Sequence, residues 1–248
     1  MRDNDLPVTA VVLAGGLGTR LRRVVADLPK PMASIAGTPF IAHLLRYWGA
    51  QGVGRFVLSV GYMHEKIAAY IGSSFEGCDV EYVVEPAPLG TGGALTKCVA
   101  DLRLADDFLL LNGDTYFEVE LPALRSFAAR ANADWVLSLF NSYDNERFLP
   151  IRLDNDGRVK SLSTRGPSSS SHTPGWANGG VYWINPASVV SSGSRSACSL
   201  ENDLLPKTLA AGRRVFGFAS SGFFIDIGVP EDFARAQTLR AFDRGVDK

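Results

Sequence analysis

A buried strand that runs directly into glycines is the feature that most constrains this chain. Residues 8–14 are apolar except for Thr9, and Gly15 and Gly16 follow at once. A continuous apolar run of this length is typical of a strand covered on both faces, as in parallel sheets with helices on either side. The sequence therefore predicts an α/β fold whose first strand ends in a glycine loop.

The next 130 or so residues repeat this alternation of strand and helix patterns. Strands are expected at residues 56–60, 80–84, 108–111 and 135–140, and helices at residues 39–50, 64–71, 91–102 and 121–131. Connections of this length between strands indicate βαβ crossovers and a parallel sheet. We predict a three-layer α/β/α, Rossmann-like fold with a mostly parallel sheet.

The pattern changes after about residue 145. A β-hairpin insertion is expected at residues 151–153 and 159–162, around the turn Asn155-Asp156-Gly157. Further strands are expected at residues 181–184, 215–219 and 224–227, helices at residues 200–211 and 230–242, and a surface loop at the serine-rich residues 166–175. Because neither a repeat nor a linker divides the chain, we expect residues 1–248 to form a single domain.

Composition excludes several functional classes. The chain has 25 Lys and Arg against 26 Asp and Glu, so a broad basic face for nucleic acid is not expected. No apolar run approaches the roughly 18 residues of a membrane span, and the first residues leave no room for a signal peptide. Cys78, Cys98 and Cys198 are odd in number and far apart, which disfavours disulfides and zinc and favours a cytoplasmic location.

The loop at residues 15–18 contains three glycines, whose backbone can approach a ligand closely and whose N–H groups can surround an anion. A dinucleotide GxGxxG motif would need glycine at position 21, where Leu21 stands, and a Walker A loop would need a Gly-Lys pair, which the chain lacks. We interpret the segment as a phosphate loop whose charge comes from Arg20 and Lys30. A simple glycine turn with a solvated arginine is the alternative.

The loop and its downstream motifs resemble those of the sugar-phosphate nucleotidyltransferases. Residues 13–21 read LAGGLGTRL, and residues 29–32 read PKPM. Later motifs follow in the family's order to about Phe233: Glu85 with PLGTGGA at 88–94, NGD at 112–114, NGGVY at 178–182, END at 201–203 and FIDIGVPED at 224–232. Each motif alone is a weak signal, whereas the ordered set is specific.

The resemblance implies a nucleotide-binding half at about residues 1–114 and a sugar-phosphate-binding half at about residues 115–248. It places the triphosphate of an NTP on the loop, with Arg20 at the outer phosphates and Lys30 at the reacting ones. The nucleotide-binding residues implied in this way are Leu13, Gly15, Gly16, Gly18, Thr19, Glu85, Gly90 and Thr91. Thr91 is also expected to cap the helix that follows it.

The implied reaction is attack by a sugar 1-phosphate oxygen on the α-phosphorus of an NTP, with loss of pyrophosphate. Catalysis then consists mainly of positioning and charge neutralisation. Arg20, Lys30, Asp114 and Asp226 are the expected catalytic residues, and by resemblance the two aspartates, each at a strand end, hold Mg²⁺. Whether one or two ions bind stays open, and a plain Asn-Gly-Asp turn is the alternative for Asp114.

The base is predicted from hydrogen-bond complementarity. Guanine presents two adjacent donors, N1–H and the N2 amino group, and a carboxylate such as Glu85 accepts both. Uracil and thymine present one donor between two acceptors, which suits an amide better. Glu85 resembles the family's base-reading residue in position, and this favours GTP, although CTP stays open because the cytosine amino group can also donate. A solvated residue at the end of a strand is the alternative for Glu85.

The sugar side rests on the resemblance. It implies contacts to the sugar phosphate from Gly113, Asn178, Gly179 and Glu201. Glu201 has an alternative role, because an acidic residue at a helix start is favourable with the helix dipole. Many relatives carry a Glu-Lys pair after the second hairpin strand, where this chain has Ser163-Thr164-Arg165. Arg165 or Lys160 is expected to supply the missing charge.

Within the family, the motifs most resemble D-glycero-α-D-manno-heptose 1-phosphate guanylyltransferases, which make GDP-heptose for bacterial surface polysaccharides. The alternatives are a uridylyl- or guanylyltransferase for a mannose or muramic-acid derivative, and a catalytically silent nucleotide-sugar-binding homologue. A Rossmann oxidoreductase is disfavoured because no acidic residue ends the second strand, where Val60 and Gly61 stand. The oligomeric state, a homodimer included, stays open.

Overall fold

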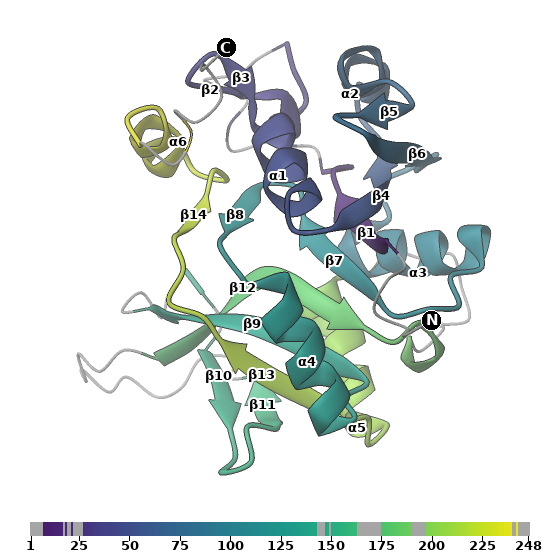
Figure 1. Cartoon of the computed structure of the whole chain (residues 1–248), viewed down its shortest axis with the longest axis vertical. Helices are drawn as coiled ribbons and strands as arrows, with labels where there is room; N and C mark the ends of the chain where they lie inside the picture. The colour runs from purple at the N-terminus through teal and green to yellow at the C-terminus, as the bar shows by residue number, and fades with distance from the viewer. Residues whose placement is uncertain are drawn as a thin grey trace.

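A ten-stranded sheet, to which both halves of the chain contribute strands, is the framework of the protein (Figure 1). The computed structural model describes residues 7–16, 18, 21, 27–142, 147–148, 150–162, 175–189, 197–239 and 242. Along the sheet the strand order is β11-β10-β12-β7-β1-β4-β6-β5, with β9 paired to β12 and β13 paired to β9.

The N-terminal part of the sheet is parallel. Its strands are β1 (Val8–Leu13), β4 (Val53–Val60), β6 (Cys78–Val84) and β7 (Phe108–Asn112), with the short antiparallel β5 (Ser74–Phe75) at the edge. The central strands are fully buried at Val11, Val57 and Leu110, which explains their unbroken apolar sequences. The carboxyl ends of β1, β6 and β7 therefore lie at one edge of the sheet.

The C-terminal part joins this sheet through β12 (Gly175–Ile184), which runs antiparallel to both β7 and β9 (Trp135–Ser142). Strand β13 (Val215–Ala219) pairs in parallel with β9, and β10 (Pro150–Leu153) with β11 (Val159–Leu162) forms the predicted hairpin. Strand β12 begins well before the expected residue 181. Its register against β9 breaks between Asn178 and Tyr182, where two glycines interrupt the apolar pattern.

Helices cover both faces of the sheet. Helices α1 (Phe40–Gly49), α2 (His64–Ile71) and α4 (Leu121–Ala131) pack on one face, and α3 (Gly90–Leu102) and α5 (Leu205–Ala210) on the other. Trp48 of α1 and Leu95 of α3 are fully buried in the two separate cores. The predicted three-layer α/β/α fold is confirmed, and antiparallel pairings at β5, β10, β11 and β12 make its sheet mixed.

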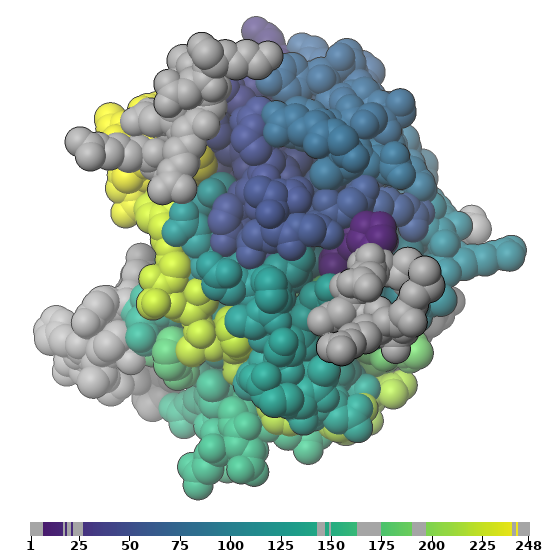
Figure 2. Space-filling model, viewed as in Figure 1, coloured from purple at the N-terminus to yellow at the C-terminus, as the bar shows by residue number. Residues whose placement is uncertain are grey.

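A third core lies beside the main sheet and positions the end of the chain. Strand β8 (Thr115–Phe117) pairs antiparallel with β14 (Phe224–Asp226), and α6 (Pro230–Ala236) follows. Tyr116, Ile225 and Ala236 are buried in this core. In the space-filling view, yellow residues near the end of the chain lie on the left side of the molecule, beside the blue residues of the N-terminal part (Figure 2).

Two short hairpin strands and three non-α helical turns complete the described structure. They are β2 (Ser34–Ile35), β3 (Thr38–Pro39), a 3₁₀ turn at Lys30–Met32, a 3₁₀ turn at Pro186–Ser188 and a π-helical turn at Leu200–Leu204. No helix in the described part of the chain is long and apolar enough to cross a membrane. Most of the expected serine-rich loop lies outside the described residues.

Two predicted helices differ from the structure. The helix expected at residues 200–211 begins as the π-helical turn, and α5 begins after it with Pro206 in its first turn, where the missing N–H costs little. The helix expected at residues 230–242 ends at Ala236. The next residue, Gln237, uses its side chain to bond the β2–β3 hairpin, donating to Ser34 O at 2.7 Å and accepting from Ala36 N at 3.1 Å.

Candidate active site

A cavity of about 400 Å³ lies at the edge where the parallel strands end. Its lining contains every described residue that was expected to bind nucleotide: Leu13, Gly15, Gly16, Gly18, Glu85, Gly90 and Thr91. Lys30, Gly113 and Asp114 also line it, whereas Asn178, Gly179, Glu201 and Asp226 do not. A larger hollow of about 1220 Å³ lies at the other end of the sheet, beside Val8 and Leu104, and no predicted site residue that the structure describes lines it. We therefore place the candidate active site at the smaller cavity.

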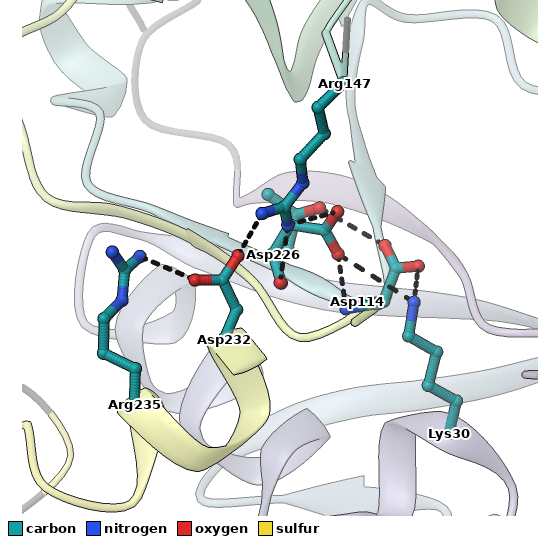
Figure 3. Close-up of polar contacts among 8 residues, drawn as sticks. Lys30, Asp114, Arg147, Asp226, Asp232 and Arg235 are labelled. Atoms are coloured by element: carbon teal, nitrogen blue, oxygen red, sulfur yellow. Dashed lines mark hydrogen bonds and ion pairs between the residues drawn. The ribbon is translucent and has the colours of Figure 1, made fainter. Parts of the chain in front are cut away.

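Lys30 and two aspartates form a charge cluster at this cavity (Figure 3). Lys30 Nζ donates to Asp114 Oδ2 and lies 3.9 Å from Asp226 Oδ1. The pairing of β8 with β14 places Asp226 opposite Thr115, and the N–H of Ile227 donates to Asp114 O at 3.0 Å. Two carboxylates that are far apart in the sequence are thus held side by side, with a lysine whose side chain is only 14% exposed.

This pair of carboxylates fits a divalent cation. Burial and the nearby Asp114 charge raise the pKa of Asp226, while Lys30, the Gly228 N–H and Arg147 partly oppose that rise. A shared cation relieves such like-charge repulsion. Among the described residues, no group of three or more His, Cys, Asp or Glu side chains could hold a metal. Two carboxylates with further oxygens from water or phosphate match the coordination that Mg²⁺ prefers.

Glu85 lies at the end of β6 with its carboxylate directed by two contacts. Ser59 Oγ donates to Oε1 at 3.1 Å, and the N–H of Leu89 donates to Oε2 at 3.1 Å. A Cβ atom at position 15 would lie 2.2 Å from Glu85 Oε1, so a larger residue there would displace the carboxylate from this position. Since an ionised carboxylate offers about four acceptor positions, Glu85 retains capacity to bind a donor edge.

A buried polar network joins the two residues expected to contact the sugar. Tyr182 is fully buried; its hydroxyl accepts from Asn178 Nδ2 and donates to Glu201 Oε1 at 3.2 Å. Burial, reinforced by the Glu201 charge, raises the pKa of Tyr182 well above its usual value, so the hydroxyl stays a donor at neutral pH. Sequence reasoning assigned Tyr182 no role, although it lies within the NGGVY motif.

Thr91 does not cap helix α3, contrary to expectation. The helix begins one residue earlier, at Gly90, and Thr91 Oγ1 donates to Glu201 Oε2 at 3.2 Å and accepts from Leu200 N at 2.8 Å. Gly90 has φ +68°, and a Cβ there would lie 2.6 Å from Cys198 O. The start of α3 is therefore bound to the segment that carries Glu201, so Glu201 does more than complement a helix dipole.

Two glycines expected at the sugar phosphate are tightly packed. A Cβ at Gly179 would lie 2.3 Å from Phe117 Cδ1, and a Cβ at Gly113 would lie 2.6 Å from Leu13 O. Gly113 therefore allows close packing after the end of β7, and Gly179, inside β12, allows close packing against Phe117 of β8. Lys160 is exposed on β11 and does not line the cavity. Thr19, Arg20 and Arg165 lie outside the described residues.

Sequence reasoning missed Arg147, which contacts the aspartate pair directly. Its Nη2 lies 3.2 Å from the backbone oxygen of Asp226 and 3.3 Å from Oδ2, and its Nη1 pairs with Asp232 (Figure 3). Asp232 also pairs with Arg235 at 3.1 Å. Arg147 belongs to no motif, so only the fold reveals its position.

Comparison with known proteins places this fold and site in a family. The model of the family described as nucleotidyl transferase matches residues 9–241, and the chain belongs to that family. Members of this family generally use a divalent metal. The predicted family is thereby confirmed.

Individual relatives cover nearly the whole chain. It is 38% identical to the D-glycero-alpha-D-manno-heptose 1-phosphate guanylyltransferase of Aneurinibacillus thermoaerophilus, over 92% of this chain and 96% of that protein. The enzyme of the same name from Campylobacter jejuni is 33% identical, over 90% and 96%. Crystal structures of HddC from Yersinia pseudotuberculosis, one of them complexed with GMP-PN, superpose with a TM-score of 0.79 at 32% identity, covering 93% of this chain and 98% of HddC.

The Tyr182 network predicts a stability effect. Tyr182→Phe removes a fully buried hydroxyl and deprives both Asn178 and Glu201 of a partner. We expect the free energy of unfolding to fall by about 1–3 kcal/mol, measured by urea denaturation. Tyr82→Phe is the matched control, because the exposed Tyr82 hydroxyl donates to Gly72 O at 2.6 Å and water can replace it. Equal losses in the two variants would contradict the network.

Proposed function

We propose that this protein condenses GTP with D-glycero-α-D-manno-heptose 1-phosphate, giving GDP-heptose and pyrophosphate. The observation that carries the proposal is the cluster of Lys30, Asp114 and Asp226 at the end of the cavity that also contains Glu85. Similarity over at least nine-tenths of the chain to two heptose 1-phosphate guanylyltransferases supports this choice of substrates. A cytoplasmic location, where GTP is available, is part of the proposal.

The reaction brings two anions together, and the site provides the means to hold them. The glycine loop after β1 offers backbone N–H groups to the triphosphate, and Lys30 offers an ammonium group where the cavity meets the aspartates. Asp114 and Asp226 would hold Mg²⁺, which when bound neutralises charge on phosphate oxygens. An oxygen of the sugar phosphate then attacks the α-phosphorus while Lys30 donates to the phosphate oxygens as charge accumulates.

Base and sugar are read at the two sides of α3. On one side Glu85 accepts from guanine N1–H and N2, and its carboxylate is already directed by Ser59 and Leu89. On the other side Glu201, held by Tyr182 and Thr91, offers acceptors to sugar hydroxyls. Because these groups are fixed by the fold, little entropy is lost in orienting them on substrate.

The proposal is tested by measuring pyrophosphate release with GTP, Mg²⁺ and a panel of sugar phosphates. The panel contains D-glycero-α-D-manno-heptose 1-phosphate, mannose 1-phosphate and a muramic-acid 1-phosphate derivative, with a control lacking any sugar phosphate. We expect the highest kcat/KM with the heptose. A higher kcat/KM with mannose 1-phosphate would reassign the sugar, and release with none of them would indicate a silent homologue.

The metal-binding role predicts loss of turnover without loss of folding. Asp114→Asn and Asp226→Asn each remove one negative charge from the pair, and we expect kcat to fall on the order of 100-fold or more. Thermal unfolding should show that both variants remain folded. Asp156→Asn in the exposed hairpin turn is the control and should retain kcat. Near-normal turnover in either site variant would refute the role of that aspartate.

The base-reading role of Glu85 predicts a change in nucleotide preference. Glu85→Gln replaces an acceptor pair by one acceptor and one donor, so kcat/KM for GTP should fall about 10- to 100-fold relative to that for UTP. Glu81→Gln on the same strand is the control, since Glu81 is directed to Arg55 at the surface. An unchanged GTP/UTP ratio in Glu85→Gln would show that another residue reads the base.

A further inference from the structure

Two cations approach the aspartate pair from opposite sides, and the mechanism above uses only one of them (Figure 3). Lys30 contacts Asp114 and faces Oδ1 of Asp226, whereas Arg147 Nη2 lies 3.3 Å from Oδ2 of Asp226. Lys30 lines the 400 Å³ cavity, as do the glycines of the loop after β1. Arg147 does not line that cavity, so it contacts the aspartate pair from a different side.

Arg147 lines a second cavity, of about 690 Å³. Its other walls include the rings of Phe140, Phe148, Trp176 and Phe224, together with Asp232. This volume lies in the range of small-molecule sites, and aromatic walls with a few charged groups are typical of such sites. Neither aspartate of the pair lines this second cavity, which reaches the pair through the contact of Arg147 with Asp226.

Arg147 is held in place before any ligand arrives. Its Nη1 pairs with Asp232, a residue in the first turn of α6 whose side chain is only 13% exposed. Its guanidinium carbon lies 4.9 Å from the centre of the Phe148 ring. A guanidinium fixed in this way loses less conformational entropy when it binds a phosphate than a mobile side chain would.

The second substrate of the proposed reaction needs such a cation. A sugar 1-phosphate carries up to two negative charges and has to approach beside the Asp226 carboxylate, so a cation in addition to Lys30 and Mg²⁺ would favour its binding. The planar guanidinium fork matches the geometry of a phosphate. Of the two residues expected to supply this charge, Arg165 lies outside the described residues, and Lys160 is exposed on β11 and lines neither cavity.

We infer that Arg147 binds the phosphate of the sugar 1-phosphate from the 690 Å³ cavity, and that Asp232 is a positioning residue that orients the Arg147 guanidinium. The inference rests on the proposed function for the identity of the ligand. It rests on the contacts of Arg147 with Asp226 and Asp232 for the place of binding.

The test measures KM separately for the two substrates, GTP and heptose 1-phosphate. In Arg147→Gln we expect KM for heptose 1-phosphate to rise at least about 10-fold, the equivalent of one lost charged hydrogen bond, while KM for GTP stays nearly constant. Arg147→Lys should recover part of the loss, and Asp232→Asn should raise the same KM by a smaller factor that Asp232→Glu restores. Arg55→Gln, which breaks a surface pair with Glu81, is the matched control.

A structural role for Arg147 makes a different prediction. If Arg147 only neutralised Asp226, Arg147→Gln would change the Mg²⁺ concentration required for half-maximal rate and affect both KM values equally, which would overturn the inference. Calorimetric titration of heptose 1-phosphate into the wild type and Arg147→Gln gives a readout that does not need turnover. If heptose 1-phosphate binds the wild type without turnover and binds Arg147→Gln more weakly, the proposed function is refuted and this inference is retained. Equal Kd values for the wild type and the variant would refute the inference alone.

Discussion

The pairing of β8 with β14 is the constraint on which the site depends. These two three-residue strands bring Asp114, after β7, beside Asp226, near the end of the chain. Burial disfavours the Asp226 carboxylate, and repulsion from Asp114 adds to that cost, so the pKa of Asp226 is raised. Lys30 and Arg147 offset that cost from opposite sides, so the arrangement persists and presents two acidic ligands where phosphates must meet.

The second structural link joins α3 to the segment that precedes α5. Thr91 and Tyr182 both donate to Glu201, and the backbone of Cys198 accepts from Gly92 N at 2.9 Å. Buried polar groups are costly unless every member finds a partner, so a satisfied network of this kind selects one arrangement of the two elements. Helix α3, which begins shortly after Glu85, and Glu201, which is expected to bind sugar hydroxyls, are therefore held in a fixed relative position.

Local patterns predicted most elements because burial on a sheet or helix face leaves a periodic signature. Helices α2 and α4 and the hairpin of β10 and β11 lie where the sequence placed them, within a residue. Strand β8 is too short to leave such a signature, and the Gly-Gly break in β12 hides its first half. Helix α6 ends at Ala236, and the next residue, Gln237, bonds a distant hairpin, a contact that no local pattern encodes.

The sequence by itself determined the strand and glycine loop, the acidic residues at strand ends, and through its ordered motifs the family. Each of these features depends on residues that are close together in the sequence, and such residues determine the local conformation of the backbone. Only the tertiary structure decided that Arg147 meets Asp226, that Tyr182 bridges Asn178 and Glu201, and that Thr91 bonds Glu201 instead of capping its helix. Such contacts join residues from different elements, so they exist only once packing of the layers has fixed the distances between those elements.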